Sequence, residues 1–177
     1  MITLGYIFTV INYFLYCVGR FMRHKKDMLL MDLLATAFTI LALYCVGSIS
    51  GTFSFCVIFL VLIFANIKER VKKKWTEFYV LFQVLYLLIL IYAYQGISSV
   101  LVFTTSTIGL FYTWWLPPQK MRLIGGYNSI LFLAYQISIK NWPGLLEILI
   151  ALSNFAAYLK YRSTKRYTIK TSHKKGK

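Results

Sequence analysis

The fold is decided by the pattern in CVGSISGTFSFCVIFLVLIFANIKERVKKK, the stretch from Cys45 to Lys74. It begins with a short uncharged turn, continues as an apolar run, and ends with a cluster of lysines and arginines. The apolar run is close to the roughly 20 residues that an α-helix needs to cross the hydrocarbon core of a bilayer. The stretch therefore predicts a transmembrane helix with one neutral end and one cationic end.

Six similar apolar runs surround this one. The seven runs begin at Leu4, Met28, Phe53, Phe78, Ile97, Met121 and Pro143. All but one of the chain's 20 lysines and arginines lie in the odd-numbered gaps between runs or in the tail from Lys160, and the exception is Lys140. Lysine and arginine are retained in cytoplasmic loops. The alternation predicts seven membrane spans, with the N-terminus outside and the C-terminus in the cytoplasm.

The composition supports the same class of protein. A chain that is 59% hydrophobic, with five acidic residues in 177, is too apolar for a soluble domain. The net charge of +15 is concentrated at the ends of the runs and in the tail, and the sequence has no nucleic-acid-binding motif. We therefore expect the cationic surface to face anionic lipids at the cytoplasmic face and no nucleic acid. The start lacks a basic n-region and a cleavage site, so the first span is expected to remain in the mature protein.

The order of spans and gaps repeats within the chain. Runs one to three and runs five to seven follow the same sequence of basic gap and neutral turn, and the fourth run returns the chain to the outer face. Both triplets then run in the same sense, the arrangement of parallel repeats found in SWEET transporters. We predict an all-α integral membrane fold with seven transmembrane helices, arranged as two parallel three-helix bundles joined by a linker helix. The expected divisions are a first bundle (1–74), a linker helix (75–96), a second bundle (97–162) and an unstructured basic tail (163–177).

Several local features are shared with a known family. They are Thr104-Thr105-Ser106-Thr107 and Trp114-Trp115 in the fifth span, Lys120-Met121-Arg122 before the sixth, and EILIALSN (147–154) followed by Tyr161-Arg162 in the last. With these features, the stretch from Ser99 to Arg162 resembles the YgjV-type family of bacterial inner-membrane proteins. The first three spans fit this family more loosely, through Gly5 and the cluster from Arg23 to Lys26. The resemblance implies an inner-membrane location and an architecture like that of the SWEET and PnuC-like transporters.

Four polar side chains within the apolar runs are candidates for binding a substrate. Ionisable side chains at membrane depth are costly, so Glu147 is interpreted as a substrate-binding or proton-coupling carboxylate. The alternative is a carboxylate that favours its own helix N-terminus. Asn12, Asn128 and Asn154 are expected at comparable depth and, with Glu147, form a predicted central pocket. The alternative for these amides is that they only join helices through hydrogen bonds.

Asp32 is a further ionisable residue inside a span. It follows the first basic gap closely, so it predicts an ion pair with Arg23 that either gates the cytoplasmic side or lies passively at the interface. The two histidines, His24 and His173, lack neighbouring ligands, and no catalytic motif is present. We therefore expect no enzyme activity, no metal and no cofactor.

These observations leave two functions open. The first is a small-solute transporter or facilitator that binds a polar substrate between the two bundles. The alternative is a non-transporting accessory or scaffold subunit, whose partner is recognised by the basic tail from Lys160 to Lys177. A homodimer is compatible with either function, because one chain contains both triplets.

Overall fold

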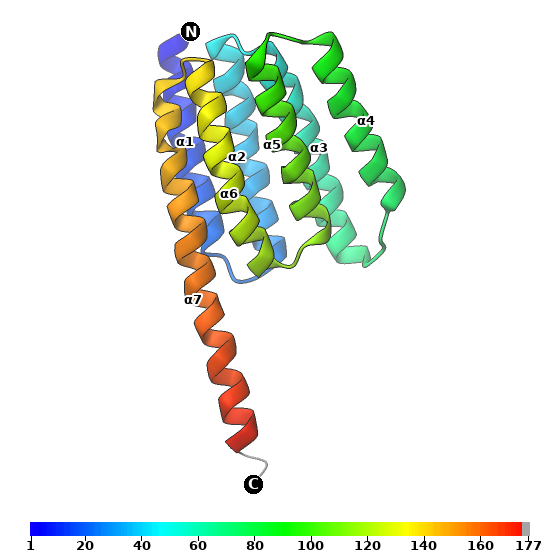
Figure 1. Ribbon diagram of the computed structural model, residues 1–177, viewed down its shortest axis with the longest axis vertical. Helices are drawn as coiled ribbons and strands as arrows, with labels where there is room; N and C mark the ends of the chain where they lie inside the picture. The colour runs from blue at the N-terminus through cyan, green and yellow to red at the C-terminus, as the bar shows by residue number, and fades with distance from the viewer. Residues whose placement is uncertain (175–177) are drawn as a thin grey trace.

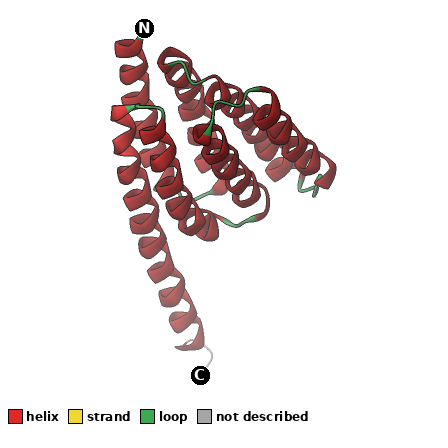
Figure 2. Cartoon of the chain, turned by 45° about the horizontal axis from the view of Figure 1, so that its top comes forward, coloured by secondary structure: helices red, strands yellow, loops and turns green. Residues whose placement is uncertain are grey.

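The computed structural model of the protein describes the backbone of residues 1–174 and the side chains of residues 1–162. Within this backbone the chain forms seven α-helices and one short 3-10 helix, joined by short connections (Figure 2). In chain order they are α1 (Ile2–Arg20), α2 (Lys25–Val46), α3 (Ile49–Val71), α4 (Thr76–Tyr92), α5 (Ile97–Trp115), α6 (Pro118–Ser138), η1 (Trp142–Leu146) and α7 (Glu147–Lys174). The expected all-α fold is confirmed.

The breaks between helices have local chemical causes. Gly47 ends α2 in the left-handed conformation, with φ at 84°, and its N–H bonds back to the last turn of the helix. Pro118 is the first residue of α6, where its missing N–H costs nothing. Pro143 lies in η1, so the last span begins as a tighter 3-10 turn before α7 continues it.

Consecutive helices run in opposite directions (Figure 1). Neighbours in the chain contact one another, and α3 also contacts α5 while α1 also contacts α7. The helices α1, α2, α3, α5, α6 and α7 therefore form a closed ring. The remaining helix, α4, packs outside this ring against α3 and α5. The N-terminus and the end of α7 lie at opposite ends of the bundle (Figure 1).

The helices have the composition of an integral membrane protein. In the described residues, five are long and apolar enough to cross a membrane, namely α1, α2, α3, α5 and the η1–α7 segment Trp142–Arg162. Helix α4 is apolar but has only 17 residues. Helix α6 has 21 residues but is more polar, because it includes the buried side chains of Arg122 and Gln136. Large apolar side chains are exposed around the outside, where the bilayer contacts them.

Apolar side chains fill the ring near both of its ends. The larger cluster has members on α2, α3, α4, α5 and α6, and it includes Met28, Leu62, Phe82 and Trp114. A smaller cluster of Leu43, Phe55, Val102 and Tyr135 joins α2, α3, α5 and α6. Members of both clusters, including Leu62 and Phe55, line the site described below.

The basic connections lie at one end of the bundle. Figure 1 places the turns after α1, α3 and α5 together at the end toward which α7 extends, while Lys140 lies at the opposite end. Some of the cations predicted to lie in gaps belong to helices instead. Arg20 is the last residue of α1, and Lys68 and Arg70 lie in the last turn of α3.

The tail differs from the expectation of an unstructured segment. Helix α7 continues through residues 163–174 and extends past the bundle (Figure 1). The chain has no proline or glycine between Glu147 and Lys174, so nothing in the sequence ends the helix earlier. Residues 175–177, the remainder of the predicted tail, lie outside the described residues.

We expect Gly51→Ala to reduce thermal stability, because a methyl group there would overlap the hydroxyl of Tyr135. That hydroxyl hydrogen-bonds the Ser48 Oγ atom at 2.7 Å. Overpacking of this kind costs about 1–3 kcal/mol. Thermal unfolding of the purified protein in detergent measures the effect. Gly109→Ala is the matched control, because its new methyl group would meet no atom closer than 3.9 Å.

A second background tests the cause of the Gly51→Ala effect. In a Tyr135→Phe protein the overlapping hydroxyl is absent, so the same change at Gly51 should reduce stability by less. An equal loss of stability in both backgrounds would contradict the close approach of these two residues.

Candidate functional site

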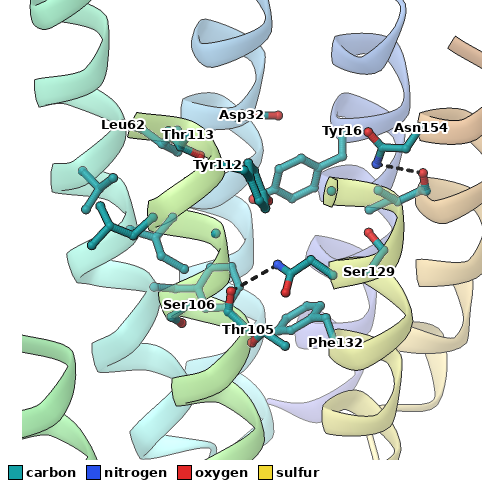
Figure 3. A pocket seen from close by; sticks show the side chains of 18 of the residues that line it. Tyr16, Asp32, Leu62, Thr105, Ser106, Tyr112, Thr113, Ser129, Phe132 and Asn154 are labelled. Atoms are coloured by element: carbon teal, nitrogen blue, oxygen red, sulfur yellow. Dashed lines mark hydrogen bonds between the residues drawn. The ribbon is translucent and has the colours of Figure 1, made fainter. Parts of the chain in front are cut away.

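A cavity of about 100 Å³ lies inside the ring of helices. This volume has room for several water-sized groups. Each of the seven α-helices contributes to its wall, α2 through Asp32 alone and α4 through Tyr86 alone. Figure 3 shows that side chains such as Tyr16, Tyr112 and Phe132 approach the space from different helices. The lining therefore combines residues that are far apart in the sequence.

The basic end of the ring is closed by Arg122 of α6. Its Nε atom donates to the carbonyl of Arg20 at 3.0 Å, and its Nη2 atom donates to the carbonyl of Met22 at 2.6 Å. Its guanidinium carbon lies 4.4 Å from the centre of the Tyr161 ring, and the Tyr161 hydroxyl donates to the carbonyl of Phe21 at 2.6 Å. Arg122 thereby satisfies carbonyl groups at the C-terminal end of α1 and joins α6 and α7 to it.

The other end is closed by a chain of uncharged polar groups. The Tyr13 hydroxyl donates to the carbonyl of Gly144 at 3.3 Å and accepts from Gln136 Nε2 at 3.3 Å. Asn141 then donates to Gln136 Oε1 at 2.9 Å and to Thr9 Oγ1 at 3.4 Å. These bonds join α1, α6 and η1. Contacts between α1 and the α6–α7 segment therefore lie on both sides of the cavity, toward the two ends of the bundle.

A buried ion pair forms part of the cavity wall. Arg20 Nη2 donates to Asp32 Oδ1, and the two side chains are only 5% and 7% exposed. The pair links the end of α1 to the start of α2. Charges at this depth are stable only when they are paired, because the surrounding apolar medium does not solvate them.

Glu147 begins α7 and faces the same cavity. It is 4% exposed. The hydroxyl groups of Ser129 and Tyr13 lie close to it. In the described residues, neither of the two ion pairs involves Glu147. The carboxyl group therefore lies in the bundle interior near hydroxyl groups and without a cation bonded to it.

Two asparagine side chains present unused acceptors. Asn128 Nδ2 donates to the carbonyl of Thr105 at 3.1 Å, and Asn154 Nδ2 donates to the carbonyl of Ile150 at 3.1 Å (Figure 3). The Oδ1 atoms of both are buried and have no hydrogen-bond partner within the described structure. An unsatisfied buried acceptor costs about 1–3 kcal/mol, so each of these atoms calls for a donor.

The structure brings together most of the residues singled out from the sequence. Asn128, Glu147, Asn154 and Asp32 all line the cavity. Asn12 is buried at 3% exposure but is not among the described residues that line it. Asn12 lies on the same face of α1 as Tyr16 but one turn closer to the N-terminus, so the difference is one of position along the helix.

The predicted pairing of Asp32 with Arg23 is replaced by a different pair. Arg23 is exposed in the turn after α1, and the partner of Asp32 is Arg20. The reason is geometric, because Arg20 is still in the helix and its side chain is held inside the ring. Arg23 lies past the end of α1, where water solvates its charge.

Other lining residues gave no signal in the sequence analysis. Tyr16 and Tyr112 resemble the many other aromatic residues of the chain, and Ser129 is a small residue in an apolar helix. The glycine pair of α6 gave a partial signal, since Gly125 lines the cavity beside Asn154 while Gly126 packs against Phe155. Among the described residues, no three histidine, cysteine or carboxylate side chains lie together in a way that could hold a metal ion.

Comparison with known proteins gives one finding. The model of a family named Imp-YgjV, described as bacterial inner membrane protein, matches residues 3–165. No curated protein and no solved structure matches the chain.

We expect Asp32→Asn to destabilise the protein by about 3–5 kcal/mol, because it leaves the charge of Arg20 buried without a counter-ion. Equilibrium unfolding in mixed micelles measures the loss. Glu69→Gln is the control, since its pair with Lys25 is partly exposed, with 30% of the Glu69 side chain accessible. Breaking that pair should cost about 0–1 kcal/mol.

Removing both charges should be far less harmful than removing one. In an Arg20→Met, Asp32→Leu protein no charge is left unpaired, so most of the stability should return. The buried ion pair between Arg20 and Asp32 is contradicted if Asp32→Asn and Glu69→Gln have the same free energy of unfolding.

Proposed function

The chain belongs to the Imp-YgjV family of bacterial inner membrane proteins, and for this multi-pass membrane protein we propose a role as a transporter or facilitator of a small polar solute. The solute binds in the central cavity, oriented by Asn128, Asn154 and Glu147. The proposal includes no chemical step, no cofactor and no metal.

The observation that carries this proposal is the group of ionisable and amide side chains that line a cavity inside the bundle. An ionisable side chain at the centre of a bilayer costs about 2.5–3.5 kcal/mol on insertion scales, and such residues typically mark the path of a substrate or ion. Here Arg20, Asp32 and Glu147 face one cavity, together with amide oxygens that have no partner. A purely structural core would have apolar side chains in these positions.

The packing of the helices supports two parallel three-helix bundles as the moving parts. Helices α1–α3 and α5–α7 run in the same sense, and within each triplet the middle helix contacts the other two. The contact of α3 with α5 corresponds to that of α7 with α1 under a half-turn about the bundle axis. In this proposal all seven helices cross the membrane, α4 joins the two bundles, and the cavity lies on the axis between them. Transporters built from parallel repeats bind their substrates in this place.

Opening to either side requires different bonds to break. Access from the basic end requires Arg122 to leave the carbonyls of Arg20 and Met22. Access from the other end requires the chain through Tyr13, Gln136 and Asn141 to separate. Since both sets of bonds join α1 to the α6–α7 segment, rocking of one triplet against the other can open one end while the other remains closed.

The orientation follows from the positions of the cations. The end of the bundle with the basic turns faces the cytoplasm and its anionic lipids, and the N-terminus lies outside. An accessory or scaffold role is the second candidate, favoured by the extension of α7 past the bundle toward the cytoplasm. Loss of a stoichiometric cross-linked partner on deletion of residues 166–177 would support that role.

We expect Asn154→Leu to abolish solute uptake while the protein still folds, because leucine fills part of the cavity and removes the amide. Uptake from a broad panel of labelled metabolites into proteoliposomes measures the effect. Asn66→Leu is the matched control, since the Asn66 amide bonds only to the carbonyl of Leu62 in its own helix. If wild type and Asn154→Leu behave alike across the panel, the cavity is not a transport site.

We expect Cys45 to react with an impermeant thiol reagent added to the outside of intact cells. It lies in the last turn of α2, at the end opposite to the basic turns. A Lys72→Cys substitution in a Cys45→Ala background gives the converse test, because Lys72 is exposed in the basic turn after α3. That thiol should be protected until the membrane is permeabilised, and the reverse pattern would invert the orientation.

A further inference from the structure

We propose that the solute bound in the central cavity is a small molecule with a protonated amine. This inference rests on the transport function proposed above and names the chemical class of the substrate. Three features of the cavity support it, namely its charge, the direction of its unused hydrogen-bond groups, and its aromatic walls.

The charges that line the cavity favour a cation. They are one guanidinium, Arg20, and two carboxyl groups, Asp32 and Glu147. Because Arg20 and Asp32 bond to each other, Glu147 is the lining carboxyl group without a bonded cation, and a bound cation would stabilise its ionised form. A carboxylate in a medium of low polarity attracts a cation much more strongly than it would in water. An anionic solute would be repelled by an ionised Glu147, and Arg20 is already paired with Asp32.

The amide atoms that have no partner at all are acceptors. The Nδ2 atoms of Asn128 and Asn154 each donate one of their two hydrogens to a helix carbonyl. Their Oδ1 atoms are buried and have no partner in the described structure. An ammonium group has three donors and no acceptor, which matches two amide oxygens and one carboxylate.

The shape of the cavity sets the size of the ligand. Gly125 keeps the space next to Asn154 open, since a methyl group at this position would come 3.4 Å from Asn154 Oδ1. Tyr16, Tyr112 and Phe132 surround the same space (Figure 3), and aromatic faces attract cations. A cavity of about 100 Å³ excludes large solutes. Arg20 Nε is a buried donor without a partner in the described structure. A hydroxyl group on the amine could accept a hydrogen bond from it.

The test compares ligands of similar size and different charge on the purified full-length protein in nanodiscs. Ethanolamine and ethylammonium are the amine probes, ethylene glycol is the neutral probe, and acetate is the anionic probe, all at equal ionic strength. We expect the amines to raise the unfolding temperature and to release heat on titration, with no response to glycol or acetate. Equal stabilisation by glycol and by the amines would overturn the inference.

Two substitutions examine the carboxylate and the amide separately. Glu147→Gln should weaken amine binding roughly tenfold or more, because a hydrogen bond to a charged group is lost. Asn154→Asp keeps the shape of the side chain and adds a negative charge, so it should strengthen amine binding. This variant tests the inference independently if Glu147→Gln does not fold. Asn66→Leu should leave the affinity unchanged. Unaltered affinity in both cavity variants would overturn the inference.

The outcomes separate the substrate class from the transport function. If amines bind and respond to these substitutions but do not cross proteoliposomes, the inference holds and the proposed function fails. If a neutral or anionic solute is taken up and Asn154→Leu blocks that uptake, the proposed function holds and the amine inference fails.

Discussion

Hydrocarbon offers no hydrogen bonds, so a polar group at membrane depth in this protein is costly unless it finds a partner inside the bundle. This constraint explains why Arg20 and Asp32 are paired and why the guanidinium of Arg122 is held by backbone carbonyls. It also explains the outer surface, where apolar side chains face the bilayer. The polar groups are gathered inside the ring of helices, and they determine which helices can approach one another there.

The two sides of the ring are held by different kinds of contact. On the side of α3, α5 and α4, the packing is apolar and aromatic, with Phe82 and Phe64 near Trp114. On the side of α1, α6 and α7, hydrogen bonds made by Arg122, Tyr13 and their neighbours add to the apolar packing. Apolar packing is dense and resists separation, whereas hydrogen bonds can exchange partners with water or with a ligand. The cavity lies between these two sides, which gives the proposed rocking motion a fixed side and a side that opens.

The same constraint leads from the fold to the proposed ligand. Amide nitrogens that bond to helix carbonyls leave their oxygens facing the cavity, and one carboxyl group lacks a bonded cation. These groups would be costly in a core whose only purpose is stability. A donor-rich solute of the kind proposed above would offset this cost.

Much of the fold was accessible from the sequence, because the signals for a membrane helix are local. Apolar length, basic ends and turn residues lie next to one another in the chain, and the family resemblance and the helical class were confirmed. Asn128, Glu147, Asn154 and Asp32 stood out for the same reason, as polar residues within apolar runs. The partner of Asp32, the exclusion of Asn12 and the role of Tyr16 depended on tertiary structure. With 3.6 residues per turn, a residue's direction changes by about 100° at each step, and only packing against other helices sets which directions face inward.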